Sequence, residues 1–396
     1  YVMKAKYSVI ILCFCLAACN SAKHDNPETL ENLAPVVQFF GTPKQQPLKL
    51  TFAGDIMAHT VNYQTSDYNL IYEDIAAILY ADDVSFANLE TPVCNELPYE
   101  SYPTFNVQTD YAEAAIVGGF DAFSLANNHT NDQSEQGITS TLDYFNSIKD
   151  RGIYSAGIKN DSSISYDIIA LQGWTILFAA ITEFANSQAY SEKFDMYTFS
   201  EKGKEALLQE IQNLQNEQEH DIFVLGVHVG DAEYVTSVSD ARRNWFYTLL
   251  DAGVDIVWAN HPHVTKEWEI VKNIDGSDGT KLIMHSIGNT ISGQTYNQNY
   301  ENPLAPRENT GTSLLLQVDI CEKIGFPHGN NDDSCNAGVI MEINPIIIVT
   351  HREENNDVVI KQLTPEFIET QNEKNATYYV QRLEYMKTIT GKITWR

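Results

Sequence analysis

The sequence VDIVWANHPHV, residues 254–264, joins a short apolar run to a dense group of polar side chains. The run has the length of a strand and is rich in β-branched and aromatic residues, so we expect a buried β-strand. His261 and His263 follow it at once, which places them in a loop at its carboxyl end. This pairing of a strand with a polar loop decides the fold class, because it recurs along the chain.

Four earlier apolar runs end in the same way, and each precedes side chains that bind metals or form strong hydrogen bonds. They are residues 48–53 before Asp55, 84–87 before Glu90, 122–126 before Asn128 and His129, and 222–227 before His228. Apolar residues at helical intervals lie between many of these runs, in residues 68–80, 138–150, 201–218 and 240–252. Alternating strands and helices predict an α/β fold with buried sheets, whose sites form beyond the carboxyl ends of strands.

The last third of the chain is richer in strands. Residues 281–286, 312–320, 339–350 and 358–363 have strand character, and a helical tail is expected over residues 366–390. We expect these later strands to complete a second sheet against the first. The length after residue 46 fits one elaborated folded domain, residues 47–396.

The amino-terminal residues have the pattern of a lipoprotein signal. Lys4 and Lys6 precede an apolar run over residues 7–18 that ends in Leu-Ala-Ala before Cys19. Twelve residues are too few to cross a bilayer of about 30 Å as a helix, and small residues before the cysteine suit a signal peptidase. We therefore expect residues 1–19 to be a signal peptide with a lipidated Cys19, residues 20–46 to be a flexible tether, and the chain to be exported and anchored to the bacterial cell envelope. A buried strand is the alternative.

The charge of the chain argues against one class of partner. The formal net charge is −28, and no basic cluster interrupts it, so we expect no nucleic-acid partner. An acidic substrate would be repelled at long range unless a bound cation or a local basic group reverses the field.

Two cysteines in the last third of the chain suggest a disulfide. Cys321 and Cys335 bracket a polar, glycine-containing stretch between two strand-like segments. In an exported protein a bond between them would stabilise the fold by about 3 kcal/mol. Zinc binding by these cysteines is less favoured, because no Cys-x-x-Cys pattern or nearby histidine pair accompanies them.

The polar groups at the strand ends form a mixed set of oxygen and nitrogen ligands. The set contains two carboxylates, an amide and three imidazoles: Asp55, Glu90, Asn128, His228, His261 and His263. Such a set suits manganese, zinc or iron(II) better than calcium, which prefers oxygen ligands alone. We expect one or two divalent ions.

Six short motifs in a fixed order resemble the CapA family of poly-γ-glutamate synthesis proteins. They are GDIM at 54–57, NLETP at 88–92, ANNH at 126–129 with Asp132 and Gly137 beyond it, HVGDAEY at 228–234, HPHV at 261–264 and SIGN at 286–289. The resemblance runs from about residue 48 to residue 292. It implies a calcineurin-like metallophosphoesterase fold, a four-layer α+β sandwich of two sheets flanked by helices.

The resemblance also implies a role for each site residue. Asp55 and His263 would hold a first ion, Glu90 would bridge, and Asn128, His228 and His261 would hold a second ion. His129 would be the general acid, oriented by Asp132.

Two departures from the phosphoesterase pattern bear on the number of ions. Met57 stands where phosphoesterases place a histidine, and the bridging position carries Glu90 rather than aspartate. A thioether is a poor ligand for a hard ion, so these departures favour one tight site or a first site completed by water. His59 is an alternative ligand that we expect to face the entrance instead.

Three functions remain open from the sequence. The leading hypothesis is a lipoprotein for synthesis, export or attachment of poly-γ-glutamate or a related polymer, with metal-assisted hydrolysis or transfer at an amide or ester. Its partners would be an acidic capsular or cell-wall polymer, the synthesis machinery and the membrane. The alternatives are a metal-dependent phosphoesterase and a non-catalytic polymer-binding scaffold. Glu233, Tyr234 and Asn289 fit either a turn or the site, whereas His285 and His351 are expected in strands.

Overall fold

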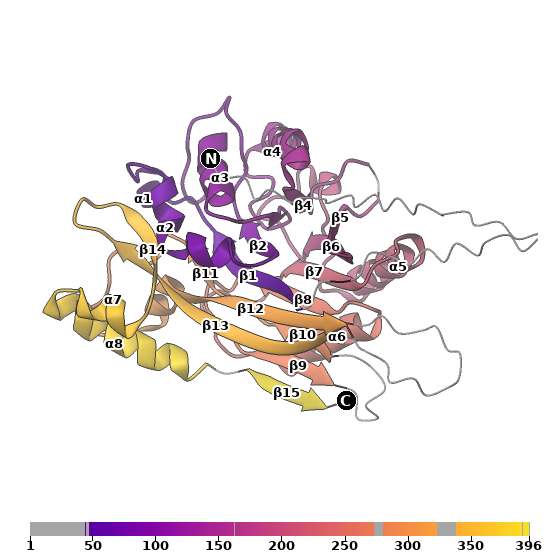
Figure 1. Cartoon of the computed structure of the whole chain (residues 1–396). Helices are drawn as coiled ribbons and strands as arrows, with labels where there is room; N and C mark the ends of the chain where they lie inside the picture. Colours follow the sequence, from indigo (N-terminus) through magenta and orange to yellow (C-terminus); the bar gives the residue numbers. More distant parts are fainter. Residues whose placement is uncertain are drawn as a thin grey trace, which may run out of the picture. The chain divides into compact units, whose positions relative to one another are not determined.

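The computed structural model describes residues 44, 47–161, 163–272, 280–322, 338–389 and 391–395. Residues Lys44–Arg396 group as one compact unit (Figure 1). The expected signal peptide with Cys19, the tether apart from Lys44, and Cys335 lie outside the described residues, so the disulfide to Cys321 stays a prediction. Within the described ranges, no helix combines the length and the apolar character needed to cross a membrane.

The first sheet places four early strands beside four later ones. Its order is β14-β13-β12-β1-β2-β3-β4, and β11 also pairs with β1. Their bounds are β1 Leu48–Ile56, β2 Val84–Leu89, β3 Ala122–Ser124, β4 Tyr154–Ala156, β11 Asn289–Ile291, β12 Thr312–Glu322, β13 Gly338–Arg352 and β14 Val358–Gln362. Strands β1 to β4 are parallel to one another.

The second sheet contains the remaining described strands. Its order is β15-β9-β10-β8-β7-β6-β5. Their bounds are β5 Tyr166–Leu171, β6 Trp174–Thr182, β7 Ile222–His228, β8 Ile256–Asn260, β9 Trp268–Lys272, β10 Thr280–Met284 and β15 Lys392–Trp395. Strands β6, β7, β8 and β10 run parallel at its centre.

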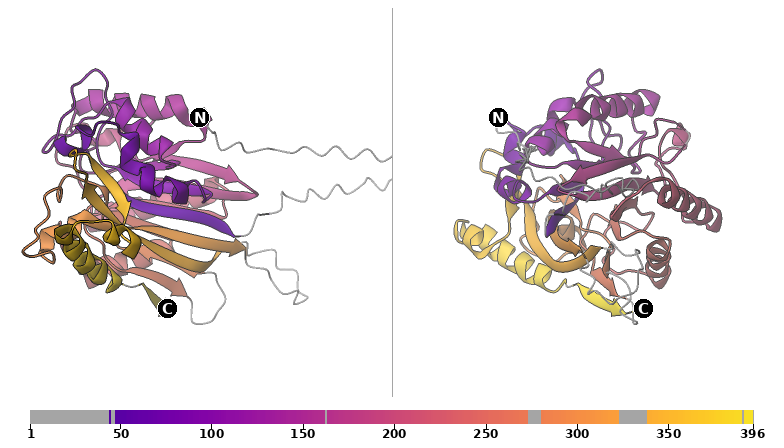
Figure 2. Two further views of the ribbon diagram at one scale, coloured as in Figure 1. Left: turned by 60° about the vertical axis from the view of Figure 1, so that its left-hand side comes forward. Right: turned by 45° about the vertical axis from the view of Figure 1, so that its right-hand side comes forward.

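Helices cover the outer faces of the two stacked sheets (Figures 1 and 2). Apolar side chains of α2, α3 and α4 pack on the first sheet, those of α5 and α6 pack on the second, and α7 and α8 pack near β13. The helices are α1 Thr60–Tyr63, α2 Asn69–Leu79, α3 Thr109–Val117, α4 Ser134–Ile148, α5 Glu201–Glu217, α6 Asp240–Asp251, α7 Pro365–Glu369 and α8 Glu373–Lys387. The predicted four-layer α/β architecture, two sheets flanked by helices, is confirmed.

Strand β7 shows why the central strands are apolar throughout. Ile222 and Val224 point into the core between the sheets, and Phe223, Leu225 and Val227 point into the core under α5 and α6. Successive side chains in a strand alternate between faces, so a strand covered on both sides is apolar at each position. Trp174 of β6 and Trp258 of β8 are buried in the core between the sheets in the same way.

The expectation for the later strands is wrong in part. Strands β12, β13 and β14 do not form a second sheet; they extend the first one, because β12 runs antiparallel to β1 from Leu48 to Phe52. Strand β10, with β9 and β15, does belong to the second sheet. Residue patterns fix which face of a strand is buried but not which neighbour it pairs with, and either sheet offered a suitable edge.

The carboxyl-terminal tail differs from its expected form in one respect. The helical tail consists of α7 and α8, after which β15 pairs in parallel with β9.

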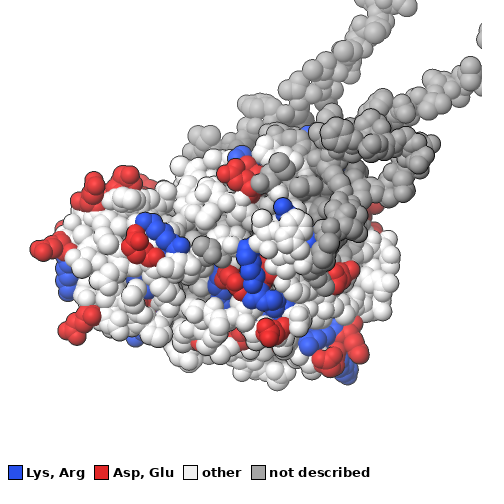
Figure 3. Space-filling model, turned by 90° about the horizontal axis from the view of Figure 1, so that it is seen from below, with Lys and Arg blue, Asp and Glu red and all other residues white. Residues whose placement is uncertain are grey.

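Figure 3 views the molecule from the side of α8 and β15, where acidic and basic side chains are interspersed. On the described part of this face, charge of one sign does not gather into a broad patch.

The carboxyl ends of β1, β2, β7 and β8 meet at one edge of the sandwich. The Trp258 indole Nε1 donates a hydrogen bond to the Ala53 carbonyl oxygen at 2.9 Å, which ties β8 to β1 across the two sheets. Gly54 lies against Gly288, where an added Cβ would come within 1.7 Å of the Gly288 oxygen. This close approach lets the Asp55 amide donate to the Gly288 carbonyl oxygen at 3.1 Å, and it brings Asp55 to the junction between the sheets.

Candidate metal centre

The structure brings the six predicted metal ligands to this edge. Each side chain comes from the end of a strand or from the loop that follows it, and all six residues are at most 5 % exposed. The set is Asp55 from β1, Glu90 after β2, Asn128 after β3, His228 from β7, and His261 and His263 after β8. Two sheets therefore contribute to one buried group of ligands, as the alternation of strands and polar loops predicts.

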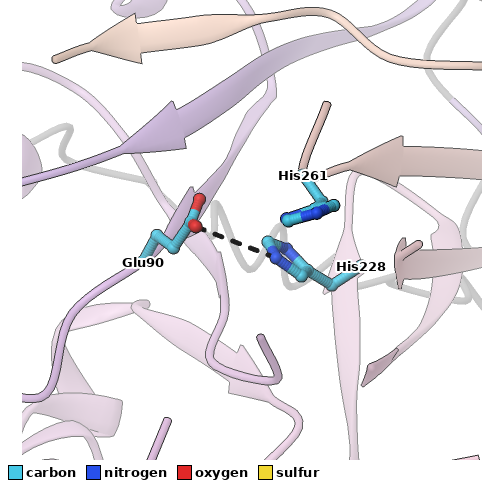
Figure 4. Close-up of side chains that lie close together, drawn as sticks. All are labelled: Glu90, His228 and His261. Atoms are coloured by element: carbon cyan, nitrogen blue, oxygen red, sulfur yellow. Dashed lines mark ion pairs between the residues drawn. The ribbon is translucent and has the colours of Figure 1, made fainter. Parts of the chain in front are cut away.

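Glu90, His228 and His261 form the first of three overlapping groups (Figure 4). Each offers one ligand atom, and these atoms lie within 4.8 Å of one another. The Glu90 Oε1 and His228 Nε2 atoms are 3.8 Å apart, and His228 Nε2 is 2.8 Å from Asn128 Oδ1. Ligand atoms held about 2.1 Å from one ion are separated by roughly 3 to 4 Å, so these atoms fit around a single divalent ion.

Asp55, Glu90 and His263 form a second group. His263 Nδ1 is 3.1 Å from Asp55 Oδ2, and His263 Nε2 is 3.9 Å from Glu90 Oε1. The Asp55 carboxylate also accepts a hydrogen bond from Asn88 Nδ2 at 2.8 Å. Since Glu90 belongs to both groups, it lies between two possible ion positions, where the resemblance places the bridging carboxylate.

The buried carboxylates have an electrostatic environment that fits a cation. Neither Glu90 oxygen has a hydrogen-bond partner among the described residues, and the positively chargeable groups within ion-pair distance of Glu90 and Asp55 there are histidines. Burial, together with the nearby Asp55 carboxylate, raises the pKa of Glu90 well above its usual value. An unpaired buried carboxylate is costly, and a divalent ion at this position would offset that cost.

His228 and His261 are in the form that binds metals. Burial lowers the pKa of both His228 and His261 well below the ordinary value, and nearby histidines add to the effect. Both rings are therefore neutral at pH 7, which leaves a nitrogen lone pair for a metal. The Nδ1 atom of His261 is buried and has no hydrogen-bond partner in the described part of the chain, so this donor set fits a borderline ion such as manganese, zinc or iron(II).

The loop after β8 holds its histidines in an unusual backbone conformation. His261 has φ of 101° and His263 has φ of 57°, with Pro262 between them. Positive φ is unfavourable for residues other than glycine and persists where the surrounding structure enforces it, often at functional sites. The conformation directs two neighbouring imidazoles, with centroids 5.6 Å apart, toward the same group of ligands.

His129 and Asp132 form a buried pair beside the ligands. His129 Nδ1 is 2.6 Å from Asp132 Oδ2, which also accepts a hydrogen bond from the Phe105 amide at 2.8 Å. The carboxylate therefore holds the proton on Nδ1 and fixes the ring, which packs edge-to-face with Phe105 at a centroid distance of 4.7 Å. This arrangement leaves Nε2 available for proton transfer.

Asn186 lies between the His129 pair and the candidate ligands, and sequence reasoning missed it. Its Oδ1 accepts from Asn128 Nδ2 at 3.2 Å, and its Nδ2 is 3.2 Å from His129 Nδ1. The first contact turns Asn128 Oδ1 toward His228. Asn186 lies in the loop after β6, 58 residues from Asn128, with no motif around it that would reveal the contact. Asn88 belongs to the NLETP motif, two residues before Glu90, but it was not predicted as a site residue.

Met57 and His59 do not supply further ligands to the described groups. The Met57 side chain is 2 % exposed and packs in the apolar core under α2, α3 and α4. His59 Nδ1 accepts a hydrogen bond from the Gly293 amide at 3.1 Å, and burial lowers its pKa to about 4. His59 belongs to none of the candidate metal-binding groups found among the described residues.

Asn289 and Tyr234, left open by the sequence, both lie beside His263. Asn289 Oδ1 is 3.0 Å from His263 Nδ1, and the Tyr234 ring centroid is 6.3 Å from that of His263. Asn289 therefore orients an imidazole of the centre, and Tyr234 lies at its exposed side.

A separate acidic group around His285 is an ion-pair network. Glu267, Glu269 and His285 also offer ligand atoms within 4.8 Å of one another, but Arg243 pairs with both glutamates and Lys392 adds two further contacts. His285 Nε2 is 2.9 Å from Glu269 Oε1. Cations of the protein itself already neutralise this group, so we assign it a role in joining β9 to β15 and α6. His285 lies directly after β10 rather than within a strand as expected, whereas His351 is a buried residue of β13, bonded to Tyr379 at 2.7 Å.

Comparison with known proteins finds relatives in capsule synthesis. Residues 49–294, more than half of the chain, match the sequence model of the bacterial capsule synthesis protein family PGA_cap. The capsule biosynthesis protein CapA of Bacillus anthracis is 25 % identical over 301 residues, which cover 72 % of this chain and 70 % of that protein. The PGA biosynthesis protein CapA of Bacillus subtilis (strain 168) is 25 % identical over 291 residues, covering 71 % and 73 %.

Solved structures are more distant. A hypothetical protein from Thermus thermophilus aligns with a TM-score of 0.42 and 13 % identity, covering 76 % of this chain and 98 % of that one. The calcineurin-like phosphoesterase YfkN from Bacillus subtilis aligns with a TM-score of 0.41 and 11 % identity, covering 87 % and 100 %. At these values the structural matches indicate nothing about activity. The match to the family over residues 49–294 shows that this chain belongs to the bacterial capsule synthesis protein family PGA_cap.

Proposed function

We propose that this protein acts in the synthesis, export or attachment of poly-γ-glutamate or a related capsular polymer, as an exported lipoprotein with a divalent metal centre. The observation that carries the proposal is the buried group of Glu90, His228 and His261 in a member of this family, beside the His129 and Asp132 pair. Its chemistry would be hydrolysis or transfer at an amide or ester bond.

The ligands divide into two sets in this proposal. One ion would be bound by Glu90, Asn128, His228 and His261. A second ion position would be formed by Asp55, Glu90 and His263. When bound, manganese, zinc or iron(II) would supply Lewis-acid polarisation of a carbonyl or phosphoryl oxygen.

The role of the protein's own groups is proton transfer and orientation. His129 donates the proton from Nε2 to the leaving nitrogen or oxygen as the bond breaks. Asp132 keeps the other ring proton on Nδ1 and stabilises the charged imidazolium from which the transfer starts. Asn186 accepts a hydrogen bond from the Asn128 amide and lies beside the His129 ring, next to both the acid and the ligands.

Genetic complementation tests the proposal. In the producing bacterium, deletion of the gene is expected to lower the capsular polymer held at the cell surface, measured by cell-associated and released polymer. The wild-type gene should restore it, whereas His129→Ala and Glu90→Gln should not, because they remove the acid and the shared carboxylate. Restoration by both variants, expressed at the wild-type level, would contradict a catalytic role.

A metal-dependent phosphoesterase is the second candidate function. The paired ligand groups around Glu90, with an imidazole acid beside them, favour it. It predicts manganese-dependent hydrolysis of an aryl phosphate that falls at least about 100-fold in His129→Ala, the lower end of the effect of general acid catalysis. Absence of turnover across a panel of phosphoesters would leave the polymer function as the better account.

A further inference from the structure

The centre contains three groups of potential ligands, and each group shares one residue with each of the other two. The groups are Glu90 with His228 and His261, Asp55 with Glu90 and His263, and Glu233 with His261 and His263. Glu90, His261 and His263 each belong to two groups. Glu233 thus completes the third side of the same cluster, and it comes from the loop between β7 and α6 rather than from a strand end.

Glu233 differs from the other members in exposure. It is solvent-exposed, whereas the others are buried. It therefore approaches the two imidazoles of the loop after β8 from the solvent side.

The loop that carries Glu233 is fastened on both sides of it. Before it, Asp231 accepts from Arg242 Nε at 3.0 Å and from Lys266 Nζ at 3.3 Å. After it, the Tyr234 amide donates to the Pro262 carbonyl oxygen at 2.9 Å, within the loop of the two histidines. The backbone at Glu233 therefore has little freedom to swing away, although the side chain is exposed.

Tyr234 shows a further sign of constraint at this position. It has φ of 65°, a conformation that costs free energy in residues other than glycine and is concentrated at functional sites. The turn lets the chain return toward Pro262 directly after Glu233. The short segment is thus shaped to bring one carboxylate to His261 and His263.

We propose that Glu233 is a metal ligand that closes the centre on its solvent side, together with His261 and His263. This inference rests on the metal centre of the proposed function. Because Glu233 is the exposed ligand, an incoming carboxylate or phosphate oxygen would replace its carboxylate first.

Calorimetric titration of Mn²⁺ into the full chain, freed of metal by chelator, tests the assignment. Glu233→Gln keeps the size of the side chain but removes its charge, and we expect it to weaken at least one binding step by about 10- to 100-fold or more, the range found for groups that merely support a ligand. His263→Ala should weaken the same step. Glu301→Gln, at another exposed loop glutamate, should titrate like the wild type.

The outcomes separate this inference from the proposed function. If the wild type binds Mn²⁺ and His263→Ala weakens binding, but Glu233→Gln titrates like the wild type, Glu233 is not a ligand and the metal centre stands. If the wild type binds no Mn²⁺, both fail. Because Glu233 is exposed, its variant is expected to stay folded like the wild type, which circular dichroism and thermal unfolding would verify.

Discussion

Replacing His228 by alanine is expected to lower the affinity of the protein for a divalent ion by at least about 100-fold, the upper end of the effect of removing a supporting group. His228 Nε2 lies 2.8 Å from Asn128 Oδ1 and 3.8 Å from Glu90 Oε1, so its loss removes the ligand that connects these two. Metal content after dialysis, measured by inductively coupled plasma mass spectrometry, gives the result directly.

A matched variant separates a lost ligand from a general effect of losing a histidine. His220 lies before β7 and bonds to the Gln218 carbonyl oxygen, at the opposite end of the strand from His228. His220→Ala should retain the wild-type metal content. Equal metal content in His228→Ala and the wild type would contradict the assignment of His228 as a ligand.

Removing the Arg242 side chain is expected to destabilise the fold by about 3 to 5 kcal/mol. Arg242 Nη1 and Nη2 donate to the two Glu183 oxygens at 2.5 and 2.6 Å, and both residues are at most 4 % exposed. Alanine at this position leaves the Glu183 carboxylate buried without its partner. Glu183 also accepts from the Gly230 amide at 2.7 Å, so the loop after His228 should loosen as well. Denaturant unfolding measures the change.

An exposed pair of the same chemistry provides the control. Arg151 makes two hydrogen bonds to Glu113, but its side chain is 45 % exposed, so Arg151→Ala should cost no more than about 1 kcal/mol. Replacing Arg242 and Glu183 together by Met and Leu should destabilise less than Arg242→Ala alone, because no unpaired charge remains. An equal decrease in the free energy of unfolding in Arg242→Ala and Arg151→Ala would contradict the account of the buried pair.

Much of the fold follows from the sequence because the central strands are covered on both faces. Runs such as residues 222–227 and 254–259 are largely apolar, and each ends at a polar loop, so their place in parallel sheets can be predicted. The pairing of β12 with β1 could not be predicted. It depends on which edge strand is available in three dimensions, and the alternation of side chains along β12 is the same for either sheet.

The candidate ligand set could be predicted from the sequence for a related reason, whereas the residues around it could not. Asp55, His228 and His261 lie at strand ends, where the topology alone brings them together. Asn186 acts through its side-chain contacts from a loop after β6, and Glu233 acts through a turn whose direction is set at Tyr234. Loop conformations of this kind depend on tertiary contacts, here the bonds of Asp231 and Tyr234.

The most direct test of the metal centre is a crystal structure of the full chain grown with Mn²⁺, with anomalous diffraction recorded at the manganese absorption edge. We predict an anomalous peak within bonding distance, about 2.0 to 2.3 Å, of Glu90, His228 and His261. At Mn²⁺ concentrations high enough to fill a second position, we predict another peak beside Asp55 and His263. A well-ordered structure with no anomalous peak among Glu90, His228 and His261 would contradict the account.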